Sequence, residues 1–138
     1  MIYLSRQASV KGGRNGHVST PNQSIDLTLT KPVEMGGVEN TFTNPEELFI
    51  SGYVACLSSS FEFLAAQSHV KYKSLVVDGH IDLKDDEIQG GFAFGVKVTF
   101  KVVGVEDTVL QSLVDQTLAF CPFSRAIKGN VKVDYSLA

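Results

Sequence analysis

The stretch FAFGVKVTFKV, residues 92–102, decides the fold class of this chain. Apolar side chains occupy every second position from Phe92 to Val102, and mostly small or polar side chains lie between them. Successive side chains of a strand point to opposite faces of a sheet, so this period of two predicts an antiparallel strand with one buried and one exposed face. Helices elsewhere in the chain are then needed to cover the buried face.

The stretch from residue 44 to residue 67 predicts a long helix. Asn44 suits the N-cap, and Pro45 suits the first helical position, which needs no N–H donor. Glu47 follows Asn44 by three residues, which is the spacing of a capping box. Gly52 is a weak helix former, so we expect packing against the rest of the chain to stabilise this helix.

A second helix is expected to begin near Asp107. Its apolar positions recur with the period of a helix, at Val109, Leu110, Leu113, Val114 and Leu118. Cys121 lies seven residues after Val114, so it faces inward with this stripe if the helix reaches it. Pro122 then fits a helix end or a tight turn.

The remaining patterns complete an α+β chain. Asn15–Gly16 is a strong hairpin signal and would join a strand around residues 2–11 to one around residues 17–20. Further strands are expected at residues 25–30, 75–83 and 131–135. This order of elements predicts an α+β fold with helices against one face of a mostly antiparallel sheet. Since the chain has 138 residues, we expect a single domain over residues 1–138.

The charge pattern argues against nucleic-acid and membrane partners. The chain carries 12 basic and 15 acidic residues, a net charge of −3, and its basic residues form no cluster. The longest apolar run, residues 48–57, is far shorter than the roughly 20 residues of a membrane span.

The first residues do not resemble a secretory signal, so a cytoplasmic protein is expected. The histidines follow no metal-ligand spacing, so no metal site is expected.

Cys56 and Cys121 are the two cysteines, and they are 65 residues apart. They lack the spacing of a CxxC motif. In the cytosol such a pair is more often reduced, catalytic or redox-sensing than a structural disulfide. Free cysteine is also among the most buried residue types, so inert packing of both side chains is the competing interpretation.

Three stretches around these cysteines match a known family. TNPEELF (residues 43–49), followed by GYVAC (residues 52–56), resembles the first-cysteine motif of the OsmC/Ohr superfamily. CPFSRAIKGNV (residues 121–131) resembles the second-cysteine motif of its organic hydroperoxide resistance (Ohr) branch. GGRNG (residues 12–16) resembles the Gly-Gly-Arg turn of the same branch. The motifs occur in the order of the family and together span most of the chain.

The resemblance implies a thiol peroxidase, an antioxidant enzyme of the stress response that reduces organic hydroperoxides to alcohols. By position, Cys56 would be the peroxidatic cysteine and Cys121 the resolving one, with a disulfide between them as the oxidised state. Arg14 and Glu46 match the catalytic Arg–Glu pair of the family. An OsmC-like α+β fold with a central Cys-bearing helix, in an intertwined homodimer, is also implied. No bound cofactor is expected, and the reductant would be an external dithiol, typically a lipoylated protein.

Physical chemistry gives a reason for each of these roles. Only a thiolate attacks a peroxide, and burial raises the pKa of a thiol, so Cys56 needs a positive partner such as Arg14. Glu46 would hold and aim the guanidinium. Glu46 and Cys56 are ten residues apart, about 15 Å along one straight helix, which one arginine could hardly bridge. Either the helix breaks near Ser51–Gly52, or Arg14 and Glu46 come from the other subunit. The second alternative is favoured because an active site that needs both subunits would explain why the protein forms a dimer.

Apolar residues near the cysteines in sequence could form a substrate pocket. Leu57, Phe61 and Phe123 would suit a hydrophobic peroxide, or could simply form core. Other functions stay open: an OsmC-branch peroxidase with a different substrate range, a thiol redox-sensing or binding module, and an inert structural domain. A sensor would be oxidised once, whereas an enzyme would consume excess hydroperoxide when given a dithiol.

Overall fold

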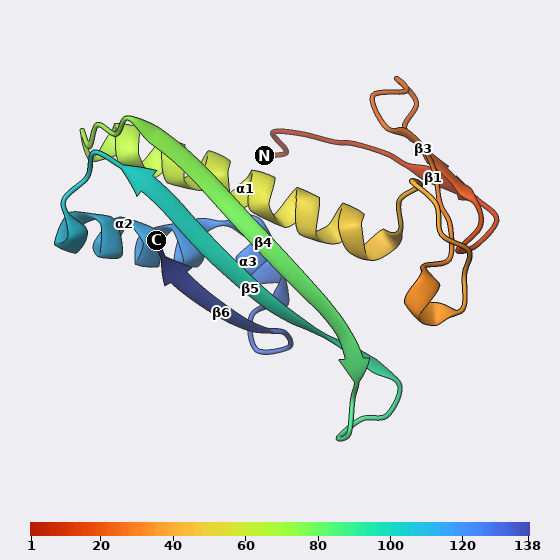
Figure 1. The fold of residues 1–138 in the computed structure, drawn as a ribbon. Coiled ribbons are helices and arrows are strands. Elements are labelled where there is room, and N and C mark those ends of the chain that lie inside the picture. The colour runs from red at the N-terminus through yellow and green to blue at the C-terminus, as the bar shows by residue number, and fades with distance from the viewer. The chain divides into compact units, whose positions relative to one another are not determined.

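Two sheets and three α-helices make up the chain in the computed structural model, which describes residues 1–138 (Figure 1). The chain divides into two units, Met1–Leu48 and Phe49–Ala138, each with its own sheet. The first unit contains β1 (Ser9–Lys11), β2 (His17–Ser19), β3 (Asp26–Thr28) and the short 3₁₀ helix η1 (Val33–Met35). The helix α1 (Pro45–Gln67) begins in the first unit and continues into the second. The second unit also contains β4 (Ser74–Asp85), β5 (Phe92–Val103), α2 (Asp107–Phe120), α3 (Pro122–Ile127) and β6 (Lys132–Leu137). The expectation of a single domain stays a prediction.

The first unit holds a small antiparallel sheet in the order β1–β2–β3. The turn at residues 12–16 joins β1 to β2, so the predicted hairpin is confirmed. The first strand is shorter than the expected 2–11, because Ser9 already pairs with Ser19, the last residue of β2. β3 covers the middle of the strand expected at residues 25–30. The extent of pairing, and not composition, sets the length of these strands.

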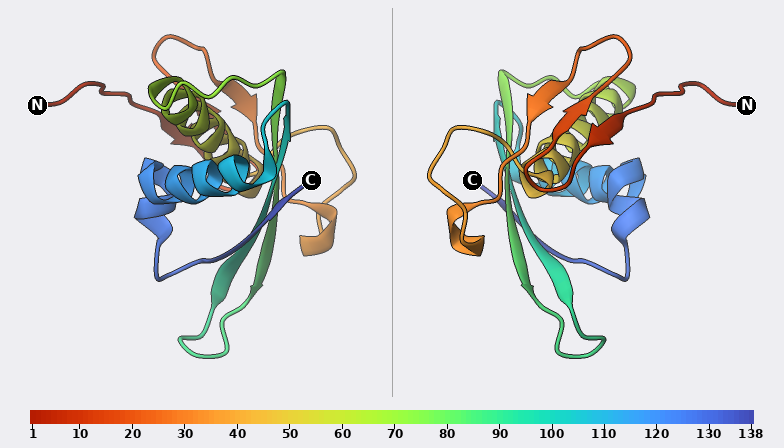
Figure 2. Two further views of the ribbon diagram at one scale, coloured as in Figure 1. Left: turned by 90° about the vertical axis from the view of Figure 1, so that its left-hand side faces the viewer. Right: turned by 90° about the vertical axis from the view of Figure 1, so that its right-hand side faces the viewer.

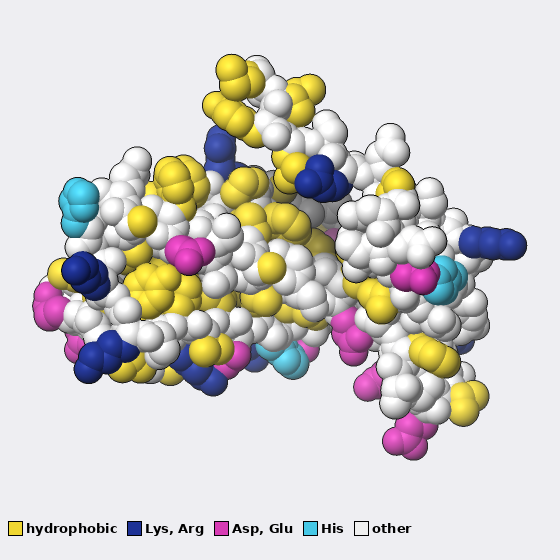
Figure 3. All heavy atoms as spheres, turned by 90° about the horizontal axis from the view of Figure 1, so that it is seen from above, with side chains coloured by type: hydrophobic (Ala, Val, Ile, Leu, Met, Phe, Trp, Pro, Cys, Tyr) yellow, Lys and Arg dark blue, Asp and Glu magenta, His cyan; other side chains and the backbone are white.

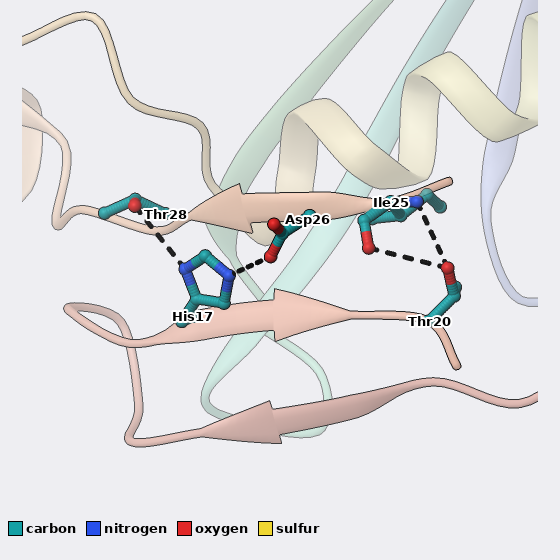
Figure 4. A network of polar contacts seen from close by, with 5 residues as sticks. All are labelled: His17, Thr20, Ile25, Asp26 and Thr28. Carbon is teal, nitrogen blue, oxygen red and sulfur yellow. Dashed lines mark hydrogen bonds and ion pairs between the residues drawn. The ribbon is translucent and has the colours of Figure 1, made fainter. Parts of the chain in front are cut away.

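Polar side chains link β2 to β3 and close the turn between them (Figure 4). The His17 ring lies between Asp26 Oδ1, which bonds its Nε2, and Thr28 Oγ1, which is 3.5 Å from its Nδ1. Thr20 Oγ1 accepts the Ile25 backbone N–H at 3.1 Å. Because His17 and Asp26 are both exposed, these contacts support the strand register and do not form a buried site.

The helix α1 begins as predicted, at Pro45 behind an Asn44 cap. Asn44 Oδ1 accepts the Glu47 backbone N–H at 2.8 Å, which satisfies one of the free donors of the first turn. The expected capping box is incomplete, because the Glu47 carboxylate accepts the Thr43 hydroxyl at 2.7 Å and not the Asn44 N–H. The helix ends at Gln67, as the sequence predicts.

The second unit is built on a sheet in the order β4–β5–β6. β4 and β5 form a long antiparallel hairpin. β6 is parallel to β5, with Val133 opposite Val96, because α2 and α3 carry the chain back to the starting end of β5 before β6 begins. The prediction of mostly antiparallel pairing is confirmed, although the strands form two sheets and not one. Parallel pairing occurs between β5 and β6 and at an isolated bridge between Leu29 and Thr43.

The two long helices lie on the same face of this sheet (Figure 2). The exposed face of β5 carries Lys97 and Lys101, and its buried face carries Val96, Val98, Phe100 and Val102. The alternation predicted for residues 92–102 is therefore confirmed from Val96 onward, while Phe92 is exposed at the hairpin end. The helices complete the core with Leu57, Phe61, Leu64, Leu110, Leu113 and Val114.

A third helix follows Cys121, where the sequence predicts a helix end or a tight turn. α2 ends at Phe120, and α3 begins at Pro122, which suits a first helical position because it needs no N–H donor. Cys121 lies between the two helices with a ψ of 124°. Its side chain is fully buried, as the apolar stripe of the preceding helix predicts.

By length and composition alone, α1 could cross a membrane, although no uninterrupted apolar run in the sequence is long enough. The core helices of many water-soluble proteins have the same composition. Tyr53, Leu57 and Phe61 of α1 are buried in the core of the second unit. The composition of α1 is therefore weak support for a membrane partner.

We expect Phe100→Ala to lower the free energy of unfolding by about 3–5 kcal/mol, because it removes a fully buried ring and leaves a cavity beside Phe61. Phe92→Ala is the matched control on the same strand. Its ring is 69% exposed, so its loss should change stability by less than about 0.5 kcal/mol. Urea unfolding followed by circular dichroism measures both values. Equal losses for the two variants would contradict the assignment of the buried face of β5.

Candidate active site

The two cysteines are 65 residues apart in sequence and meet in the second unit. Cys56 lies on α1, and Cys121 lies at the junction of α2 and α3. Both are free thiols with their sulfur atoms 3.1 Å apart, and the Cys121 S–H donates to Cys56 Sγ. Cys121 is fully buried, whereas Cys56 is partly exposed. A reagent from solvent therefore reaches Cys56 first, and Cys121 is placed to react with it afterwards.

Local sequence explains why each sulfur points inward. Cys56 shares a helix face with Tyr53 and Ser60, three residues before it and four after it, and both of these side chains are buried. Cys121 lies in line with Val114 on the buried stripe of α2. Because α1 and α2 pack in one core, the two stripes bring the two sulfurs together.

Burial raises the pKa of the Cys56 thiol, and its contact with the Cys121 thiol raises it further. Two hydrogen bonds act in the opposite direction because they favour the thiolate: one from the Phe123 backbone N–H and one from the Ser60 hydroxyl. They do not offset the effect of burial, so Cys56 needs a further positive group to ionise at neutral pH. Sequence reasoning missed Ser60, although its place one helical turn after Cys56 was the available signal.

Arg14 and Glu46 form a two-pronged ion pair in the first unit. Arg14 Nη1 donates to Glu46 Oε2 at 2.8 Å, and Nη2 donates to the other carboxylate oxygen. Arg14 lies in the turn at residues 12–16, and Glu46 lies in the first turn of α1. Hydrogen bonding with Arg14 lowers the pKa of Glu46, and Glu46 in turn raises the pKa of Arg14. The Arg–Glu pair expected from the resemblance is formed, and its paired bonds hold the guanidinium in one direction.

The helix break that was one of two alternatives is absent. α1 is continuous from Pro45 to Gln67 and passes through Ser51–Gly52 as a regular helix. A bend that brings Glu46 toward Cys56 is therefore the wrong alternative. The Arg14–Glu46 pair belongs to the first unit and the thiols to the second, and their combination in one active site stays a prediction.

Two of the three residues expected at a substrate pocket lie in the core. Leu57 and Phe61 are fully buried among side chains of β5 and α2, which supports the core interpretation for both. Phe123 is 41% exposed, and its ring is stacked on Tyr53 with 6.3 Å between centroids. No group of three or more His, Cys, Asp or Glu side chains is arranged to hold a metal ion.

Known proteins resemble this chain along nearly its whole length. The family of OsmC-like proteins matches residues 38–136, which include both cysteines. An organic hydroperoxide resistance protein of Xanthomonas axonopodis pv. citri is 35% identical over 99% of this chain and 96% of that protein. The organic hydroperoxide resistance protein OhrB of Bacillus subtilis is 33% identical over 99% of both chains.

Solved structures show the same fold. The crystal structure of an organic hydroperoxide resistance protein OsmC from Legionella pneumophila has a TM-score of 0.94 at 33% identity, and covers 100% of this chain and 99% of that one. The crystal structure of OhrB of Bacillus subtilis has a TM-score of 0.89 at 31% identity, and covers 99% of this chain and 100% of that one. The two cysteine motifs, the Arg–Glu pair and the α+β architecture thus occur on a chain with full-length relatives among the organic hydroperoxide resistance proteins. The chain belongs to the OsmC-like family, in the branch of the organic hydroperoxide resistance proteins.

Proposed function

We propose that the protein is a thiol peroxidase that reduces organic hydroperoxides to alcohols. The observation that carries this proposal is the 3.1 Å contact between two free thiols, one partly exposed and one buried. This arrangement suits a cysteine that meets an oxidant and a second cysteine that resolves the product. The names of the full-length relatives, organic hydroperoxide resistance proteins, support the substrate class.

The first step is attack of the Cys56 thiolate on the outer oxygen of the hydroperoxide. The O–O bond breaks, the sulfur becomes a sulfenic acid, and the other oxygen leaves as an alkoxide that takes up a proton to give the alcohol. Because burial keeps the pKa of Cys56 high, this step needs a nearby cation. Arg14 supplies a guanidinium that stays charged and can donate hydrogen bonds to the departing oxygen. Glu46 holds that guanidinium in its direction.

Cys121 completes the oxidative half of the reaction. Its thiol attacks the Cys56 sulfenic acid, a disulfide forms, and water leaves. The sulfurs need to approach by only about 1 Å from their present separation of 3.1 Å. An external dithiol, which we propose is carried by a lipoylated protein, then reduces the disulfide and is itself oxidised. Turnover of this kind suits a reducing compartment, and we place the protein in the cytoplasm.

We infer that a homodimer combines the Arg14–Glu46 pair with the thiols. Ten residues of unbroken helix between Glu46 and Cys56 span about 15 Å, so Arg14 would act on Cys56 of the partner subunit. The outer side of α1 supports such a contact, since Glu62 is the one charged residue of α1 after Glu47 and the neighbouring Phe63 is exposed. Figure 3 shows hydrophobic side chains at the surface on this side of the molecule. Only 33% of an 18-residue apolar stretch of α1 is buried within the chain. A second copy packed on this side would cover it.

Steady-state peroxidase assays test the proposed reaction. With lipoamide as the dithiol, we expect faster consumption of tert-butyl and fatty-acid hydroperoxides than of hydrogen peroxide. Cys56→Ser should abolish turnover because it removes the nucleophile, and Cys121→Ser should allow one oxidation and then accumulate sulfinic acid. Ser74→Ala, an exposed serine at the start of β4, serves as the control and should keep full activity. Preference for hydrogen peroxide with thioredoxin, or turnover by Cys56→Ser, would contradict the proposal.

The pH dependence of stability tests the Arg14–Glu46 pair. Because the pair lowers the pKa of Glu46 in the folded protein, it stabilises the fold above the ordinary titration range of a glutamate, and this stabilisation is lost as the pH falls through the lowered pKa. We expect wild type to be more stable than Glu46→Gln at pH 7, with a difference that shrinks below about pH 4. Urea unfolding at a series of pH values gives the difference. Glu87→Gln, at an exposed position in the loop between β4 and β5, is the control, and a Glu46→Gln effect that grows on acidification would contradict the assignment.

Mixing of inactive subunits tests where Arg14 acts. Arg14→Ala should lower kcat/KM by about 10²–10³-fold, and Cys56→Ser should be inactive. A mixed dimer of these two variants contains one complete site only if Arg14 reaches across the interface. Random reassortment of subunits should then restore about one quarter of wild-type activity.

Arg14→Ala mixed with the double variant Arg14→Ala/Cys56→Ser is the control, because no arrangement of its subunits makes a complete site. Native mass spectrometry of tagged subunits shows whether mixed dimers have formed. Mixed dimers that remain as inactive as the control would show that Arg14 acts within its own subunit. A wild-type protein that is monomeric at assay concentrations and fully active would exclude the dimeric site altogether.

A further inference from the structure

Tyr53 and Ser124 form a hydroxyl pair beside the two cysteines. Tyr53 lies on α1, three residues before Cys56, and its side chain is 1% exposed. Its hydroxyl is 2.7 Å from Ser124 Oγ, and Ser124 lies on α3, three residues after Cys121. The pair therefore connects the helix that carries one cysteine to the helix that follows the other.

The Phe123 ring joins the same two segments. It is stacked on Tyr53, with 6.3 Å between ring centroids and 10° between ring planes. It also lies against Gly52, where a Cβ atom would come within 3.3 Å of the ring. The missing side chain at Gly52 thus permits the close approach of Phe123 to α1. The stacked rings set the distance between α1 and α3. The hydrogen bond between the two hydroxyls sets the orientation of α3 about its own axis, relative to α1.

The direction of the Cys121 side chain depends on how α3 is held. Cys121 follows the last residue of α2 and precedes α3, with φ and ψ of −58° and 124°. A rotation about the φ bond of this non-helical residue would move α3 and the Cys121 sulfur together, away from Cys56. α3 has six residues, too few to be stable without contacts to the rest of the unit. Its contacts with Tyr53 add to the hydrogen bond from the Phe123 N–H to Cys56 and help to keep the two sulfurs in line.

We propose that Tyr53 and Ser124 are positioning residues for disulfide formation, because their hydrogen bond holds α3, and with it the Cys121 thiol, against Cys56. This inference rests on the proposed peroxidase function. The assisted step is attack of the Cys121 thiol on the Cys56 sulfenic acid, which forms the S–S bond, breaks the S–O bond and releases water. The competing step is oxidation of that sulfenic acid to sulfinic acid by a second hydroperoxide, which leaves as an alcohol. The pair thus sets the fraction of turnovers that end in over-oxidation.

The chemistry of the pair supports a geometric role. Taking a hydroxyl out of water costs free energy unless it is hydrogen-bonded, and a phenylalanine next to an alanine would fill this space without that need. The pKa of Tyr53 is raised, mainly by burial, so its hydroxyl stays protonated and uncharged at neutral pH. The hydrogen bond between Tyr53 and Ser124 can therefore persist while Cys56 ionises, is oxidised to the sulfenic acid and forms the disulfide with Cys121.

Rapid-quench mass spectrometry of the full chain, with tert-butyl hydroperoxide as the oxidant, tests this proposal. Tyr53→Phe and Ser124→Ala should leave the rate of the first oxidation of Cys56 unchanged. Disulfide formation should slow by roughly three- to tenfold, the effect of one hydrogen bond on a rate, and the sulfinic acid fraction should rise accordingly. Ser124→Thr restores a hydroxyl and should recover most of the wild-type rate. Tyr72→Phe removes a tyrosine hydroxyl elsewhere around the core and is the matched control.

The double variant Tyr53→Phe/Ser124→Ala separates positioning from stability. It leaves no hydroxyl unpaired, so its thermal stability should be closer to wild type than that of Ser124→Ala. Slow disulfide formation in this double variant, with a normal first oxidation, supports the proposal. Wild-type rates of disulfide formation in all three variants overturn it and leave the peroxidase function standing. If wild-type protein itself forms no Cys56–Cys121 disulfide with the hydroperoxide, the proposed function fails as well.

Discussion

Burial of one apolar face of the β4–β5–β6 sheet is the constraint on which the thiol site depends. β5 buries every second side chain from Val96 to Val102, so α1 and α2 must cover that face together. Cys56 and Cys121 each lie on the apolar stripe of the helix that carries or precedes them. Covering the sheet therefore brings two sulfurs that are 65 residues apart in sequence to a separation of 3.1 Å.

The same burial opposes the chemistry of the thiols. Removing Cys56 from water raises its pKa, and the Phe123 N–H and Ser60 hydroxyl only partly reverse that effect. The first unit holds a cation that could meet this need under the proposed function, since Glu46 holds Arg14 there in a fixed direction. One unit thus provides the two sulfurs and their contact, and the other provides a cation. The proposed dimer would let both act on one sulfur without a bend in α1.

The sequence predicts a helix or strand correctly only where the periodicity of its side chains or a capping residue determines that element. The alternation in residues 92–102 predicts β5, and the Asn44–Pro45 start predicts α1, because each depends on neighbours along the chain. α3 carries no such signal, since six residues beginning Pro-Phe-Ser are as typical of a turn as of a helix. The hydrogen bond between Tyr53 and Ser124 joins residues 71 positions apart, which no local pattern marks.

By itself the sequence determined the α+β class, the long helix that carries Cys56, the inward direction of Cys121 and, through its motifs, the family. These features follow from residue spacing, which acts over a few positions of the chain. Only the tertiary structure decided that the two sulfurs are in contact, that α1 is unbroken, and that Ser60 and the Phe123 N–H face the thiol. The physical reason is that these properties depend on burial and on contacts between distant segments, and the pKa of a thiol responds to its surroundings and not to its place in the sequence.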